Sequence, residues 1–357
     1  MAWSLILGLV ALTGLAQAIP SERLQDACVT YYQGKCMPGG CQGDQIDLRM
    51  DCGNGGSCCR GVVAANTPAD TPNPRLNDVC GSIMGKSSRI IGGETYARCT
   101  LPYSSMVGLR FFFENDLNKM GNITFCAGSL IDEDLVVTTG HCIEPYVQGD
   151  GMPMLSEIRV IVGGYDSYIT DYGNDGAPED RAKIAEAKVH PNYNRNSLDN
   201  NIALIRLDRK IKYNNCKIPA CLPRRAENVQ CGQVQNECQM AGLGTRFEDE
   251  FRPFPRPSKA DVRVFDKSTS SGILRYMDGL NPEGSVIVEP IQAQQKACAF
   301  DWGGIVMCPR DGRWELSGLI SFHNCLQNGN VPIIAVDIAQ YRGWIESCAP
   351  DFTQCII

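Results

Sequence analysis

The sequence is short of the residues that hold metal ions. It has only three histidines, His141, His190 and His323, and none of its 19 cysteines form a Cys-x-x-Cys pair. Structural zinc sites usually need such closely spaced ligands, so we expect no metal. Basic residues are not in excess either, because 33 lysines and arginines stand against 40 acidic residues. This balance gives no support for nucleic-acid binding, which usually shows a basic face.

Long apolar runs are missing except at the start of the chain. Residues 1–18 are apolar over the length of a signal-peptide core and end in Ala16-Gln17-Ala18, the small-x-small pattern that signal peptidase cuts. The run is short for a bilayer of about 30 Å. We therefore predict a signal peptide, no membrane span and a secreted, extracellular protein. Secretion predicts that the cysteines form disulfides, and their odd number leaves at least one free or paired with another chain.

Three further segments follow. Residues 19–60 hold six cysteines in a stretch too small for a hydrophobic core, so we expect disulfides to stabilise this module. Residues 61–79 are rich in Pro, Asn, Asp and Ala and have the composition of an exposed linker. From residue 90 onward, short β-type runs such as Ser104–Phe113 and Leu316–Phe322 alternate with turn residues, which predicts an all-β sandwich or barrel. Gln340–Glu346 is expected to be helical.

A series of motifs in a fixed order occupies residues 80–347. They are Arg89-Ile90-Ile91-Gly92-Gly93, Cys126–Leu130, Val137–Cys142 with His141, Asn200–Leu204, Cys238–Gly242, Cys298–Gly304 and Ser321-Phe322-His323. Together they resemble the trypsin-like serine proteases. The resemblance implies a mainly β domain over residues 90–347, with two packed six-stranded antiparallel barrels and a C-terminal helix, followed by a tail over 348–357.

The same resemblance locates a catalytic triad with two members replaced. The base position is His141, the carboxylate position is Asn201, and the nucleophile position is Trp302. Indole has no hydroxyl and cannot form an acyl-enzyme. In well-studied proteases the change from carboxylate to amide costs about 10⁴ in turnover and loss of the nucleophile about 10⁶. One of the two oxyanion-hole positions is Phe300 in place of glycine, and its Cβ restricts the backbone.

The specificity pocket also departs from the family's pattern. Lys296 occupies the floor position, and His323 and Ile333 occupy wall positions where the family commonly has glycine. We expect a closed pocket. These changes together predict a protein that is not an enzyme, in which His141 is a leftover imidazole near Asn201 rather than an acid–base catalyst.

Two features of the family's activation mechanism are retained. Cleavage after Arg89 would free the α-amino group of Ile90, which the resemblance implies would pair with Asp301 in the interior. An unpaired buried carboxylate is costly, so we hypothesise that cleavage orders a binding surface. The alternative is that both residues are inherited remnants.

The resemblance also implies disulfides. In the protease-like domain the implied pairs are Cys80–Cys221, Cys126–Cys142, Cys238–Cys308 and Cys298–Cys325. Five cysteines stay unassigned: Cys99, Cys216, Cys231, Cys348 and Cys355.

The six-cysteine module resembles the clip domain of arthropod proteases. That resemblance implies the pairs Cys28–Cys58, Cys36–Cys52 and Cys41–Cys59. Because acidic residues outnumber basic ones in this module, we favour a docking module over a membrane-active peptide.

Two surface features remain. Asn122-Ile-Thr124 is a candidate glycosylation site. The Asp166–Asp180 loop lies where some relatives bind Ca²⁺, and we interpret it as a solvated loop.

The whole chain resembles the clip-domain serine protease homologues of arthropods. The resemblance implies a non-catalytic cofactor of a melanization or clotting cascade in haemolymph, with an active clip protease and prophenoloxidase as partners. The alternative is a protein that recognises microbial surfaces or cells directly.

Overall fold

The structure is a computed structural model of residues 1–357. It describes residues 35–38, 45–51, 56–61, 80–81, 103–114, 120–147, 155–164, 180–214, 216–223, 235–245, 257–274, 284–292, 295–322 and 332–355. The predicted signal peptide and linker, Arg89, Ile90, His323, most of the Asp166–Asp180 loop and Cys28, Cys41, Cys52, Cys99, Cys231 and Cys325 lie outside these residues. For Cys36, Cys58, Cys59 and Asn122 only the backbone is described.

The cysteine-rich module contains a small antiparallel sheet. Its strands are β1 (Lys35–Pro38), β2 (Gln45–Asp51) and β3 (Gly56–Gly61), in the order β1-β3-β2. In the register of this sheet, Cys36 lies opposite Cys58 and Asp47 lies opposite Cys59. The cysteines are therefore carried on paired strands, as a module stabilised by disulfides requires.

The first of two closed barrels follows. Its strands are β4 (Met106–Glu114), β5 (Met120–Leu130), β6 (Leu135–Thr138), β7 (Ile158–Val162), β8 (Asp180–Val189) and β9 (Ala203–Leu207), in the order β4-β5-β6-β9-β8-β7. Alternate residues point inward along each strand. In β7, for example, Ile158, Val160 and Val162 belong to the barrel core, whereas Arg159 between them is only half-buried.

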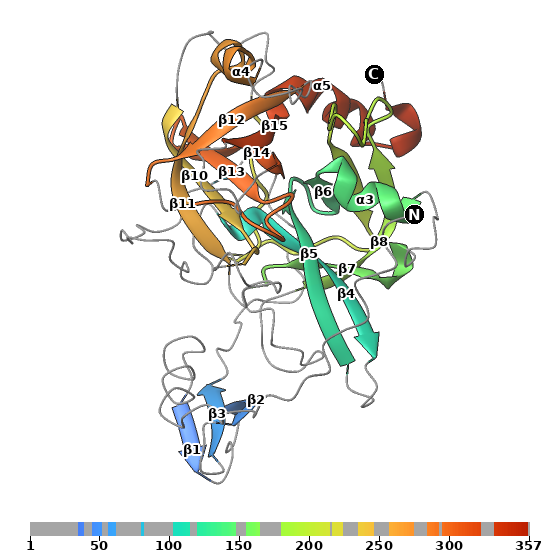
Figure 1. Cartoon of the computed structure of the whole chain (residues 1–357). Coiled ribbons are helices and arrows are strands. Elements are labelled where there is room, and N and C mark those ends of the chain that lie inside the picture. The colour runs from blue at the N-terminus through green and yellow to red at the C-terminus, as the bar shows by residue number, and fades with distance from the viewer. Residues whose placement is uncertain are drawn as a thin grey trace, which may run out of the picture. The chain divides into compact units, whose positions relative to one another are not determined.

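The second barrel has the same number of strands. They are β10 (Gln235–Gly242), β11 (Ser258–Val264), β12 (Ser285–Pro290), β13 (Ile305–Arg310), β14 (Arg313–Phe322) and β15 (Ile333–Asp337), in the order β10-β11-β12-β15-β14-β13. Figure 1 shows both barrels. The predicted fold, two six-stranded antiparallel barrels with a C-terminal helix, is thereby confirmed.

Helices are few in the part of the chain that the structure describes. They are α3 (Gly140–Val147), α4 (Lys267–Leu274) and α5 (Ile338–Cys348), with 3-10 turns η1 (Tyr103–Ser105), η2 (Leu155–Glu157) and η4 (Phe352–Gln354). The Asp337 side chain accepts a hydrogen bond from the Ala339 N–H at 3.1 Å and so caps the start of α5. No described helix is both long and apolar enough to cross a membrane.

Disulfides connect distant parts of the protease-like domain. Three pairs implied by the resemblance are formed: Cys80–Cys221, Cys126–Cys142 and Cys238–Cys308. Cys298 and Cys216 are also disulfide-bonded, while Cys325, the partner expected for Cys298, lies outside the described residues. A further pair, Cys348–Cys355, joins two cysteines that the sequence left unassigned.

That last disulfide belongs to a clamp between the C-terminal tail and the first barrel. Arg206 on β9 donates a hydrogen bond to the Ala349 carbonyl at 2.6 Å, and its guanidinium lies 4.9 Å from the centre of the Phe352 ring. The same guanidinium also pairs with Asp134 at 3.2 Å. Phe352 is only 1% exposed and packs with Trp344 and Ile345 of α5. The C-terminal tail therefore forms part of the hydrophobic core.

We expect Phe352→Ala to lower the free energy of unfolding by about 3–5 kcal/mol, because a buried ring and its cation–π contact are lost. Urea denaturation measures this. The control is Thr353→Ala, whose exposed side chain lies in the same turn and should cost about 0.5 kcal/mol or less. Similar losses for both variants would show that the tail is not part of the core.

Candidate functional site

His141 is fixed at the start of α3 by a close approach of the neighbouring loop. A Cβ on Gly140 would lie 3.2 Å from the ring of Tyr193 and 3.3 Å from Oδ1 of Asn201, so the loop over residues 190–201 packs directly on this turn. The backbone N–H of His141 donates to Asn201 Oδ1 at 2.9 Å. His141 and Asn201, 60 residues apart in the chain, are thus held together as predicted from their motifs.

The Asn201 amide contacts His141 with both of its polar groups. Its Oδ1 already accepts the His141 backbone N–H, and its Nδ2 donates to Ser321 Oγ at 2.8 Å while lying 3.0 Å from His141 Nδ1. Asn201 Oδ1 also lies 3.3 Å from the same Nδ1, so which group donates between the amide and the ring depends on the tautomer of His141.

His141 is also a weak base. Burial lowers its pKa to about 4, and the side-chain hydrogen bond with Asn201 offsets only part of that decrease. A carboxylate at position 201 would favour the imidazolium, but the neutral amide offers no such charge. The ring is therefore neutral at any pH near 7.

Trp302 lies against this imidazole. The two rings meet edge to face, with centroids 5.8 Å apart and an angle of 84° between their planes. The Trp302 indole is half-buried and packs against the core of the first barrel, and its carbonyl accepts the Ala127 N–H at 2.8 Å. The position that faces the base thus carries an aromatic ring and offers no hydroxyl or thiol.

Phe300 has a backbone conformation that glycine would favour. Its φ is +71°, in the left-handed region where a side chain is strained. Gly303, in the same turn, has φ +74° and approaches the first barrel so closely that a Cβ would lie 2.0 Å from the Ala127 carbonyl oxygen. The turn therefore keeps its shape even though a phenylalanine stands at a position suited to glycine.

Asp301 is partly buried and packs against two glycines. Its carboxylate accepts the backbone N–H groups of Cys298 and Gly244, both at 2.8 Å. A Cβ on Gly242 or Gly244 would collide with the carboxylate, at 1.9 and 2.3 Å. Burial raises the pKa of Asp301 to about 6, although both N–H groups lower it. No cationic group pairs with it among the described residues.

Two of the three predicted pocket positions, Lys296 and Ile333, lie within the described residues. Lys296, expected at the floor, has an exposed side chain at the surface, where an ammonium keeps its hydration. Ile333 is 4% exposed and packs with Ala297 in the core of the second barrel. His323 lies outside the described residues.

Ser321 and Gly244, which hold Asn201 and Asp301, had no assigned role in the sequence analysis. The only indication of these roles in the sequence is that both residues lie within or beside recognised motifs.

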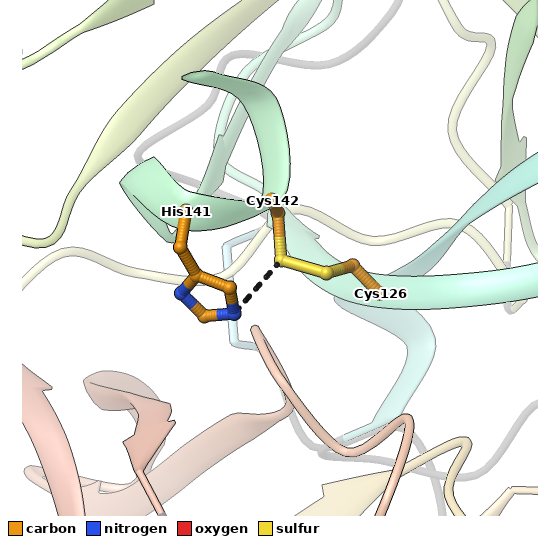
Figure 2. Close-up of side chains that lie close together, drawn as sticks. All are labelled: Cys126, His141 and Cys142. Carbon is orange, nitrogen blue, oxygen red and sulfur yellow. Dashed lines mark hydrogen bonds between the residues drawn. A yellow bond between two sulfur atoms is a disulfide. The ribbon is translucent and has the colours of Figure 1, made fainter. Parts of the chain in front are cut away.

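The sulfur atoms beside His141 are committed to a disulfide. Figure 2 shows Cys126 and Cys142 bonded to each other, with His141 Nε2 at 3.6 Å from the Cys142 sulfur. These three side chains are the one His/Cys/Asp/Glu group in the described part of the chain with the spacing of a metal site. In the disulfide they offer no thiolate ligands.

The chain has two closed barrels, and its motifs occur in the expected order and bring His141, Asn201 and Trp302 together. These features define it as a protein of the serine-protease type. The model of the trypsin family matches residues 90–345. The chain therefore belongs to the trypsin family.

Individual relatives narrow this description. The chain is 28% identical over 240 residues to protein masquerade of Drosophila melanogaster, a match covering 65% of this chain and 21% of masquerade. It is 28% identical over 297 residues to CLIP domain-containing serine protease B4 of Anopheles gambiae, a match covering 81% of this chain and 76% of that protease. It is 24% identical over 265 residues to human transmembrane protease serine 5, a match covering 74% of this chain and 52% of the human protein. The chain thus spans about a fifth of masquerade and half of the human protein. The two insect relatives support a clip-domain serine protease homologue.

We expect Phe300→Gly to raise the free energy of unfolding by about 1 kcal/mol, because glycine relieves the left-handed strain. Chemical denaturation measures the change. The matched control is Ala299→Gly, next to it, where φ is not positive and added backbone freedom should cost about 0.5–1 kcal/mol. A loss of stability in both variants would show that the Phe300 side chain compensates for its strain.

Proposed function

We propose that this protein is a secreted, catalytically inactive serine protease homologue that binds proteins of an extracellular innate-immune protease cascade and regulates them. The observation that carries the proposal is the contact between the Trp302 indole and a neutral His141 held by an amide. The nucleophile and the negative charge of a triad are both missing at one place, while the surrounding fold is intact.

A site without these catalytic groups can still bind other proteins. Both barrels, their disulfides and the hydrogen bonds of Asn201 are retained. The similarity to masquerade and to a CLIP domain-containing protease supports protein partners in a protease cascade. By resemblance to arthropod clip-domain homologues, those partners are an active clip protease and prophenoloxidase, and the setting is melanization or clotting in haemolymph.

The buried Asp301 supports regulation by cleavage. Its carboxylate is held by two backbone N–H groups, and burial raises its pKa because no described cation offsets the charge. We propose that cleavage after Arg89 supplies the missing cation, the α-ammonium of Ile90. Formation of that pair would stabilise the loops that contact Asp301, which are the turn at 298–304 and residues 242–244.

Incubation with a fluorophosphonate probe should label neither the natural protein nor Trp302→Ser. The variant regains a hydroxyl, but Asn201 still supplies no negative charge to the imidazole and Phe300 remains at the oxyanion position. Trypsin labelled in the same assay is the positive control. Labelling of the natural protein would contradict the non-catalytic proposal, and labelling of the variant would contradict the account of Asn201 and Phe300.

The cleavage switch predicts opposite pH dependences for the cut and uncut chains. In uncut Arg89→Gln, folded Asp301 keeps its proton to about pH 6, whereas the unfolded chain loses it near 3.8. Stability therefore falls by about 2.4 kcal/mol as the pH rises from 4 to 7. In the cut chain an ion pair with Ile90 would depress the pKa of Asp301, so its contribution persists above pH 4 and is lost on acidification.

The comparison isolates Asp301 because His141 affects both forms equally. The lowered pKa of His141 makes both chains more stable as the pH rises from about 4 to 6.5, and this contribution cancels in the difference. Urea denaturation of each form across this pH range gives the measurement. If the difference between the forms did not change with pH, Asp301 would not receive the new terminus.

The partner is tested by pulldown from haemolymph with cut protein and with Arg89→Gln as bait. A cascade cofactor should retain an active clip protease or prophenoloxidase, and only the cut form should alter prophenoloxidase cleavage. Binding of both forms to bacteria or glycans, with no effect on cleavage, would replace this proposal with direct microbial or cell-surface recognition.

A further inference from the structure

The hydroxyl of Tyr341 on α5 reaches the loop that carries Asn201. It donates to Oδ1 of Asn200 at 3.1 Å, although the two residues are 141 positions apart in the chain. Asn200 lies between β8 and β9 of the first barrel, directly before the Asn201 whose amide contacts His141. The C-terminal helix thus contacts this loop one residue away from the candidate site.

Asn200 belongs to a turn with an unfavourable backbone conformation. Its φ is +52° and that of Leu198 is +60°, both in the left-handed region. This region is disfavoured for residues with a side chain, although asparagine tolerates it better than most. Strained conformations persist only where surrounding contacts hold them, so the shape of this turn depends on its neighbours.

Both polar groups of the Asn200 side chain make such contacts. Oδ1 accepts the Tyr341 hydroxyl, and Nδ2 donates to the Asn192 carbonyl at 3.2 Å, in the same loop. The Asn200 carbonyl accepts the Ile202 N–H at 2.8 Å across Asn201. Asn201 is therefore enclosed in a turn that is held from α5 on one side and from its own loop on the other.

Tyr341 is itself fixed where elements of both barrels meet. The residue is only 5% exposed. A Cβ on Gly284, directly before β12 of the second barrel, would lie 1.9 Å from the Tyr341 hydroxyl oxygen, so the hydroxyl occupies space that a glycine leaves open. The ring of His190, directly after β8 of the first barrel, meets the Tyr341 ring edge to face with centroids 5.5 Å apart. These contacts keep the hydroxyl directed at Asn200.

We propose that Tyr341 is a positioning residue that links α5 to the Asn201 turn. While its hydroxyl holds Asn200, the Asn201 side chain stays on the His141 N–H, and the imidazole keeps its place against Trp302. A displacement of α5 would release the turn and alter the surface at His141 and Trp302 without any contact at these two residues. The inference goes beyond the proposed cascade role and does not depend on it, because it concerns how the site is held.

Hydrogen exchange of the His141 backbone N–H, followed by NMR, tests the proposal. This N–H donates to the Asn201 side chain at 2.9 Å, so its exchange rate reports local opening of the turn. Tyr341→Phe removes only the hydroxyl and should make this exchange about fivefold faster, as expected for the loss of one hydrogen bond. The reference is the Leu207 N–H, which donates to the Asp134 carbonyl at 2.8 Å in the first barrel and should exchange at an unchanged rate.

Tyr193→Phe is the matched control. The Tyr193 hydroxyl is buried without a hydrogen-bond partner among the described residues, and its ring packs on Gly140 beside His141. Removing this hydroxyl should accelerate neither exchange rate. A second background is Asn200→Gly, which removes the acceptor and tolerates the positive φ. In that background Tyr341→Phe should have no further effect on the His141 N–H.

Three results would overturn the proposal. The first is an unchanged His141 exchange rate in Tyr341→Phe. The second is an equal acceleration at Leu207, which would show a loss of overall stability instead of a local release. The third is an equal effect of Tyr341→Phe in the Asn200→Gly background, which would show that the hydroxyl does not act through Asn200. These measurements need no partner protein, so their failure is distinguishable from failure of the proposed function.

Discussion

The hydrogen bonds of a single amide, the side chain of Asn201, organise the centre of this molecule. Asn201 Oδ1 holds the start of α3 through the His141 N–H, and Nδ2 reaches across to Ser321 in the second barrel. An amide can make these bonds as well as a carboxylate could, but it brings no charge. The junction between the barrels is therefore kept, while the imidazole beside it is a weak base without a carboxylate partner.

Asp301 presents the opposite case, a carboxyl group kept where no described cation pairs with it. Gly242 and Gly244 leave room for it and two N–H groups bind it. Burial without a cation is costly. The two residues thus show which property of the protease each position retains: hydrogen-bonding shape at Asn201 and ionisation at Asp301.

Much of this could be predicted from the sequence because the motifs are local. The short β-type runs were sufficient for an all-β domain, and the resemblance carried by the motifs around His141, Asn201 and Trp302 implied the two barrels and the cluster of site residues. What depends on contacts between distant residues could not be predicted. Examples are the Phe352 clamp with its disulfide and the partnership of Asn201 with Ser321.

The disulfide between Cys80 and Cys221 has a consequence for valency. Cys80 precedes Arg89 in the chain and is bonded to Cys221 in the protease-like domain, so a chain cut after Arg89 would stay in one covalent piece. A ligand bound by the cysteine-rich module and another bound by the barrels would then be held by one covalently linked molecule. Each would raise the effective concentration of the other, and two weak contacts would combine into avid assembly without any new interface.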